Sequence, residues 1–161
     1  MKILFLEPPK DSWFVMGEYL PPPLGILQLA AFLEERDKSL EIEVLDCQAS
    51  RLNWKGLEKR IESADPDIVA SSGLATCNAY VAVRALEIAK RVRPEAITVV
   101  GGQHFTATAQ ESLEKFEEID AIVRGEGEQT LAELVQRFGE GSSFSQIRGL
   151  SFRHEGKIQH N

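Results

Sequence analysis

Five short runs of apolar residues, rich in β-branched side chains, recur along the sequence with helical patterns between them. The runs are Ile3–Leu6, Ile42–Leu45, Ile68–Ala70, Ile97–Val100 and Ala121–Val123. They lack the sustained alternation of apolar and polar residues that marks a strand with one solvated face. Runs of this kind are typical of parallel strands that helices cover on both faces. This feature therefore limits the chain to α/β folds with a buried parallel sheet.

The segments between these runs carry apolar residues at helical spacing. Near the end of the chain, the i, i+3, i+4, i+7 stripe of a half-buried helix is formed by Leu131, Leu134, Val135 and Phe138. The same spacing predicts three further helices, marked by Leu57 and Ile61, by Ala85, Ile88 and Val92, and by Ala109, Leu113 and Phe116. The first helix, from Pro23 to Glu35, begins with a proline, which suits a first helical turn. It is apolar nearly all round, so we expect it to be well buried.

Five strand–helix units in series predict a doubly wound α/β sandwich of the flavodoxin or Rossmann type. The expected sheet has five parallel strands in the order 2-1-3-4-5, and ligands bind such sheets at the carboxyl ends of the strands. After Phe138 the pattern changes to a loop and a short hairpin, with strands at Leu150–Phe152 and Lys157-Ile158 around a turn at Glu155-Gly156. We therefore expect one domain over residues 1–138, and we expect residues 139–161 to lead into a further part of a longer protein.

The charge and the cysteine count exclude several classes of function. The chain carries 18 basic and 25 acidic side chains, a formal net charge of −7, whereas proteins that bind nucleic acids or anionic membranes need a basic face. Two cysteines, Cys47 and Cys77, are too few for a disulfide framework or for the ligands of an iron–sulfur cluster. No apolar stretch approaches the roughly 20 residues of a membrane span, and Ile3–Leu6 is too short for a signal-peptide core. The sequence therefore predicts a cytoplasmic protein.

The loops after the predicted strands are where a ligand is expected. The first, Glu7–Pro22, is proline-rich and far longer than the usual connection of about two to six residues, so it is either a binding flap or a surface insertion. The loops Ser71–Thr76, Gly101–His104 and Arg124–Glu128 are built largely of small residues, which let a ligand approach the backbone. Neither a phosphate-binding P-loop nor a GxGxxG dinucleotide fingerprint is present. Three such loops at one edge favour a large ligand that lies over the edge.

Several motifs in these loops are familiar. Ser72-Gly73-Leu74 fits an S-x-L pattern, and Gly101-Gly102 follows after 26 intervening residues. Four blocks occur in the same order as in one family: Glu7–Pro9, Pro22–Ala31, Gly101–His104 and Asp120–Glu128. The chain resembles the N-terminal cobalamin-binding domains of cobalamin-dependent radical S-adenosylmethionine (SAM) enzymes. The group most similar to it is that of the anaerobic magnesium-protoporphyrin IX monomethyl ester oxidative cyclases.

The resemblance implies a corrin ring over the carboxyl edge, with its nucleotide tail in the groove between the third- and fourth-strand loops. The cofactor-binding residues that it implies are Leu24, Ser72, Gly73, Leu74, Thr76, Gly101, Gly102, Gln103, His104, Gly125, Glu126, Gly127 and Glu128. Many cobalamin-binding domains carry a D-x-H-x-x-G motif whose histidine ligates cobalt from below, and this sequence has none. Counting back the usual spacing from Ser72 places Leu27 where that histidine would stand. We therefore expect a weakly ligated lower face, with His104 or Tyr19 as the alternative lower ligands.

The same resemblance implies a longer parent enzyme, a methyltransferase or an oxidative cyclase. Its radical SAM domain would be the partner of this chain and would bind SAM and a [4Fe-4S] cluster through a CxxxCxxC motif, which this sequence lacks. The chain alone is expected to bind cobalamin without catalysing a reaction. Two alternatives stay open. One is a docking module of the same fold that has lost the cofactor. The other is an unrelated small α/β enzyme, against which the lack of a nucleophile–base pair argues.

Overall fold

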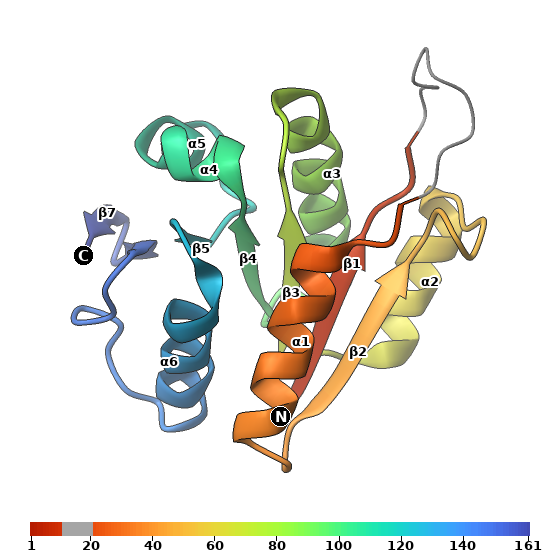
Figure 1. Cartoon of the computed structure of the whole chain (residues 1–161). Helices are drawn as coiled ribbons and strands as arrows, with labels where there is room; N and C mark the ends of the chain where they lie inside the picture. The colour runs from red at the N-terminus through yellow and green to blue at the C-terminus, as the bar shows by residue number, and fades with distance from the viewer. Residues whose placement is uncertain (11–20) are drawn as a thin grey trace.

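The computed structural model describes residues 1–10 and 21–161 (Figure 1). The elements in chain order are β1 (Lys2–Glu7), α1 (Leu24–Arg36), β2 (Glu41–Asp46), α2 (Trp54–Ala64), β3 (Ile68–Ser72), α3 (Thr76–Val92), β4 (Ile97–Gly101), α4 (Gln103–Ala107), α5 (Ala109–Lys115), β5 (Ala121–Val123), α6 (Gly127–Gly139), β6 (Leu150–His154) and β7 (Lys157–His160). The predicted α/β class is confirmed, and each of the five apolar runs lies in a strand.

All strands of the described residues belong to one sheet, in the order β2-β1-β3-β4-β5-β6-β7. The pairings from β2 to β5 are parallel, whereas β6 pairs antiparallel with β5, and β7 with β6. The prediction of a five-stranded sheet is therefore wrong in its extent. The hairpin joins the sheet because Leu150 and Phe152 are buried against the edge that β5 would otherwise leave unpaired. The division of the chain at residue 138 stays a prediction.

Helices cover both faces of the sheet and form two separate apolar cores (Figure 1). On one face, α1 and α6 pack against side chains such as Ile3, Ile68 and Val99. On the other face, α2, α3 and the α4–α5 pair pack against side chains such as Leu4 and Val69. The two sets alternate along each strand because successive side chains of a strand point to opposite faces. This arrangement explains why the central strands carry apolar residues on both faces.

Helix α1 is less buried than its composition predicts. Only Ile26, Ala30 and Leu33 are buried, whereas Leu24 is 71% exposed and Leu27 is 40% exposed. The expectation of a well-buried helix is wrong because an outer-layer helix buries one stripe and leaves the opposite side to solvent. The exposed leucines lie in the first turns of α1, at the carboxyl edge of the sheet.

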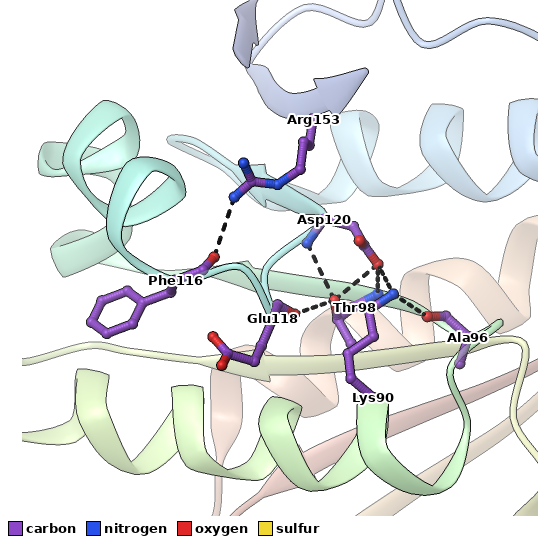
Figure 2. Close-up of polar contacts among 7 residues, drawn as sticks. All are labelled: Lys90, Ala96, Thr98, Phe116, Glu118, Asp120 and Arg153. Atoms are coloured by element: carbon purple, nitrogen blue, oxygen red, sulfur yellow. Dashed lines mark hydrogen bonds and ion pairs between the residues drawn. The ribbon is translucent and has the colours of Figure 1, made fainter. Parts of the chain in front are cut away.

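A polar network holds the opposite, amino-terminal edge of the central strands (Figure 2). The Asp120 carboxylate forms an ion pair with Lys90 and accepts hydrogen bonds from the backbone NH of Thr98 at 2.9 Å and from its hydroxyl at 3.0 Å. Lys90 also donates to the carbonyl of Ala96 at 2.9 Å. Arg153 of β6 donates to the carbonyls of Leu113 and Phe116, at the end of α5. The network joins α3, β4, β5 and the hairpin far from the small-residue loops.

We expect Asp120→Ala to lower the free energy of unfolding by about 1.5–3 kcal/mol, because it leaves Lys90 and the Thr98 amide without their charged partner in a half-buried place. The control is Glu41→Ala. Glu41 forms an ion pair with Lys2, and its side chain is 71% exposed. Its replacement should therefore lower the free energy of unfolding by less than about 1 kcal/mol. Urea unfolding followed by circular dichroism measures both. Equal losses in the two variants would contradict the role given to the network.

None of the helices in the described residues is both long and apolar enough to cross a membrane.

Candidate functional site

A cleft of about 570 Å³ opens at the carboxyl edge of the sheet, between the first turns of α1 and α6. Its lining comes from five places in the sequence: β1, α1, the ends of β3 and β4 with the loops that follow, and the β5–α6 connection. The lining residues are Phe5, Gly25, Ile26, Gln28, Leu29, Ala70, Ser71, Ser72, Leu74, Val99, Val100, Gly101, Gly102, Gln103, Thr106, Ala107, Val123, Gly125, Glu126, Gly127, Glu128 and Leu131.

The hollow exists because the central strands carry small side chains on this face. Phe5 of β1 lies in register with Ala70 of β3, and Ala70 lies in register with Val99 of β4. One step closer to the edge, Ser72 lies opposite Gly101. Residues two apart on a strand share a face and are about 7 Å apart. The cleft therefore reaches at least two residues down from the strand ends before it meets larger side chains.

The loops after β3 and β4 are interlocked at the mouth of the cleft. The NH of Gly73 donates to the carbonyl of Gly101 at 2.9 Å, and the NH of His104 donates to the carbonyl of Gly73 at 3.2 Å. Gly102 has a φ of +94°, and a Cβ atom there would lie 2.9 Å from the Gly73 oxygen and 3.0 Å from the Ser72 hydroxyl. A Cβ atom on Gly73 would lie 2.6 Å from the buried ring of Phe105. Both positions thus require glycine, for space at Gly73 and for space and backbone angle at Gly102.

Polar side chains gather at the mouth of the cleft and few of them are engaged. The hydroxyl of Thr106 accepts a hydrogen bond from the NH of Gly125 at 3.1 Å. The side chains of Ser72, Gln103, Glu126 and Glu128 make no hydrogen bond or ion pair among the described residues. The mouth therefore offers hydroxyl, amide and carboxylate groups that are free to meet a polar ligand.

The structure brings most of the sequence-predicted site residues to this cleft. The residues that line it are Ser72, Leu74, Gly101, Gly102, Gln103, Gly125, Glu126, Gly127 and Glu128. Four others do not line it, namely Leu24, Gly73, Thr76 and His104. Nδ1 of His104 lies 3.3 Å from the hydroxyl of Thr76, beside the cleft. Tyr19, the other candidate lower ligand, lies outside the described residues.

Sequence reasoning missed the floor and one wall of the cleft. The missed residues come from strand interiors and from α1, α4 and α6; they are Phe5, Gly25, Ile26, Gln28, Leu29, Ala70, Ser71, Val99, Val100, Thr106, Ala107, Val123 and Leu131. Only the register of neighbouring strands shows that Ala70 and Val99 face a hollow. The one hint in the sequence was that Ala70, a small residue, stands two positions before Ser72 of the S-x-L pattern and so on the same face of the strand.

Two further residues bear on the lower-ligand expectation. Leu27, where the spacing places the missing histidine, lies inside α1 rather than in the loop that precedes it. Cys47, which follows β2, is buried, and burial together with the nearby carboxylates of Asp46 and Glu7 raises the pKa of its thiol to about 12. At neutral pH Cys47 is therefore a neutral thiol and a poor metal ligand.

Comparison with known proteins relates this chain to a family. A family model described as the B12 binding domain matches residues 16–135. An uncharacterized methyltransferase of Pyrococcus horikoshii is 36% identical over 99% of this chain and 34% of its own length. The anaerobic magnesium-protoporphyrin IX monomethyl ester cyclase of Cereibacter sphaeroides is 32% identical over 94% of this chain and 25% of its own length. The chain thus spans about a third or less of these relatives.

Among solved structures, the radical S-adenosylmethionine methyltransferase TsrM from Kitasatospora setae, with cobalamin and a [4Fe-4S] cluster bound, superposes with a TM-score of 0.72 at 27% identity. The match covers 98% of this chain and 28% of that one. The family model matches most of the chain and the fold agrees with a solved relative. The chain therefore belongs to the B12-binding domain family, as its S-x-L and glycine motifs predict, and its cofactor is cobalamin.

Proposed function

We propose that this chain holds cobalamin with the corrin ring over the carboxyl edge of the sheet and the nucleotide tail in the cleft, as one part of a longer radical SAM methyltransferase or oxidative cyclase. The observation that carries the proposal is the hollow that Ala70, Ser72 and Gly101 create where the family motifs converge. When bound, cobalamin supplies a cobalt centre that can carry a methyl group.

The residues of the cleft fit the chemistry of such a tail. Its floor is apolar, which suits an aromatic base. Its mouth carries the side chains of Ser72, Gln103, Glu126 and Glu128, which make no hydrogen bond within residues 1–10 and 21–161 and can bond to ribose hydroxyls and corrin amides. Leu74 and Gln103 line the mouth, yet about 570 Å³ remains open. A groove blocked by Leu74 or Gln103 would favour a cofactor-free docking module, so the open volume supports the binding function instead.

The role proposed for Gly73 and Gly102 is to let the two loops lie against each other at the mouth. Their backbones are joined through the Gly73 NH and the Gly101 carbonyl at 2.9 Å. This contact fixes the relative position of the β3 and β4 ends, which form one side of the mouth through which the tail would enter the cleft. Thr76 and His104 would then support the rim from outside the cleft, through their 3.3 Å contact, and Leu24 would contact the ring from α1.

The first test is retention of the cofactor. The purified chain is incubated with hydroxocobalamin and desalted, and we expect about one equivalent to remain bound, with a changed absorbance spectrum. The control is the Ala70→Leu variant, which narrows the proposed tail site from inside. Loss of all colour from the wild-type chain on desalting would count against the proposal.

The lower face of the ring is proposed to lack a protein imidazole. None of the three histidines lines the cleft, and Nδ1 of His104 is 3.3 Å from the Thr76 hydroxyl. The electron paramagnetic resonance spectrum of the bound cob(II)alamin form should therefore show no nitrogen superhyperfine coupling, and His104→Ala should leave it unchanged. Coupling that changes when the protein histidines are labelled with ¹⁵N would refute this part of the proposal.

A further inference from the structure

The floor of the cleft is uniformly apolar. Phe5, Ala70, Val99 and Val123 face it from four neighbouring strands, and Leu131 faces it from α6. Each of these residues is between 1% and 5% exposed. A ligand group that reaches this depth exchanges its contacts with water for contacts with carbon atoms.

The polar groups near the floor are already engaged. Ser71 lies one residue beyond Ala70, so its side chain points to the opposite face, where its hydroxyl donates to the carbonyl of Leu6 at 3.0 Å. The backbone of β3 at this level pairs with β1 on one side and with β4 on the other. Among the lining side chains that make no hydrogen bond within the described residues, Ser72 is the last residue of β3, and Gln28, Gln103, Glu126 and Glu128 lie in the first turns of helices or just before α6. The floor therefore offers no hydrogen-bond partner among the described residues.

From this arrangement we infer that the cleft selects among cobamides by their lower base and favours a benzimidazole over an adenine. This inference rests on the proposed function, because it requires the tail to lie in the cleft. A benzimidazole presents a hydrocarbon edge to the floor. An adenine presents an exocyclic amine and additional ring nitrogens, which would lose water without gaining a partner. An unpaired buried polar group weakens binding by about tenfold or more.

The test compares three ligands by isothermal titration calorimetry with the wild-type chain. They are aquacobalamin, the corresponding cobamide with adenine as lower base, and cobinamide, which has no nucleotide. We expect the adenine cobamide and cobinamide each to bind about tenfold or more weakly than aquacobalamin. Equal affinity for the two complete cobamides would overturn the selectivity and leave the proposed function standing. Failure of all three ligands to bind would instead count against the proposed function.

A pair of matched variants locates the selection on the floor. Val99→Thr keeps the side-chain shape and places a hydroxyl at the floor. It should therefore reduce the ratio of the affinities for aquacobalamin and the adenine cobamide by about threefold or more. Val69→Thr makes the same change at a buried position on the other face, in the second core, and should leave the preference unchanged. Thermal melting of both variants checks that they fold. An unchanged preference in Val99→Thr, or an equal change in Val69→Thr, would overturn the inference.

Discussion

Replacing Gly102 with alanine is expected to weaken cobalamin binding by about tenfold or more and to lower the free energy of unfolding by about 2–4 kcal/mol. The backbone at Gly102 has a φ of +94°, which is unfavourable for any residue with a Cβ atom. The new methyl group would also lie 2.9 Å from the carbonyl oxygen of Gly73. Because that oxygen is backbone, the two loops must separate, and the mouth of the cleft changes shape.

The matched control for this variant is Gly141→Ala. Gly141 also has a positive φ, +63°, but a Cβ atom there has nothing within 4 Å, and the residue does not line the cleft. The free energy of unfolding of this variant should fall by only about 1–2 kcal/mol, the cost of the positive φ, and its affinity for aquacobalamin should be unchanged. Urea unfolding and calorimetric titration separate the two effects. Full affinity in a folded Gly102→Ala variant would show that the loop contact is not needed for binding.

Filling the floor of the cleft should weaken cobalamin binding strongly without unfolding the protein. Ala70→Leu adds three carbon atoms that point toward a cleft of about 570 Å³, so the fold has room for them. We expect aquacobalamin affinity to fall by about a hundredfold, because the added side chain occupies the place of the lower base. Melting temperature should stay near that of the wild type.

The control variant Ala85→Leu should instead lose stability and keep its affinity for cobalamin. Ala85 is fully buried in α3 within the core on the other face, and it does not line the cleft. Overpacking there should cost about 1–3 kcal/mol of stability, while the folded fraction binds cobalamin normally. Calorimetric titration and thermal melting of both variants give the comparison. If Ala70→Leu behaves like Ala85→Leu, Ala70 faces a packed core and the cleft is not the tail site.

Much of this fold could be predicted because its central strands are buried on both faces. Double burial favours apolar residues on both faces of Ile68–Ala70 and Ile97–Val100, so these strands stand out as mostly apolar runs, with Thr98 as the buried polar exception. The place of the hairpin in the sheet was harder to predict. Leu150–Phe152 has the pattern of any short strand, and nothing in the local sequence indicates that it pairs with β5. The exposure of α1 was also hidden, since composition does not say which side of a helix meets the sheet.

The candidate site also has a part that could be predicted from the sequence and a part that could not. Its mouth could be predicted, because glycines and hydroxyls after strands are visible as motifs, as at Ser72 and Gly101. Its floor could not, because Phe5, Ala70 and Val99 are 94 residues apart from first to last and meet only through strand register. Spacing was also a poor guide to Leu27, because counting back from Ser72 assumes no insertions between the two positions, and Leu27 lies inside α1.

The most direct test of the account follows the methyl groups of the floor by nuclear magnetic resonance. On addition of aquacobalamin, ring-current shifts are expected for the methyl signals of Ala70, Val99 and Leu131, which line the cleft. The methyls of Val69 and Leu86, in the opposite core, should stay in place. Cobinamide, which has no lower base, should leave the floor signals unshifted. Tight binding of aquacobalamin that leaves Ala70 and Val99 unshifted would contradict the placement of the nucleotide tail in this cleft.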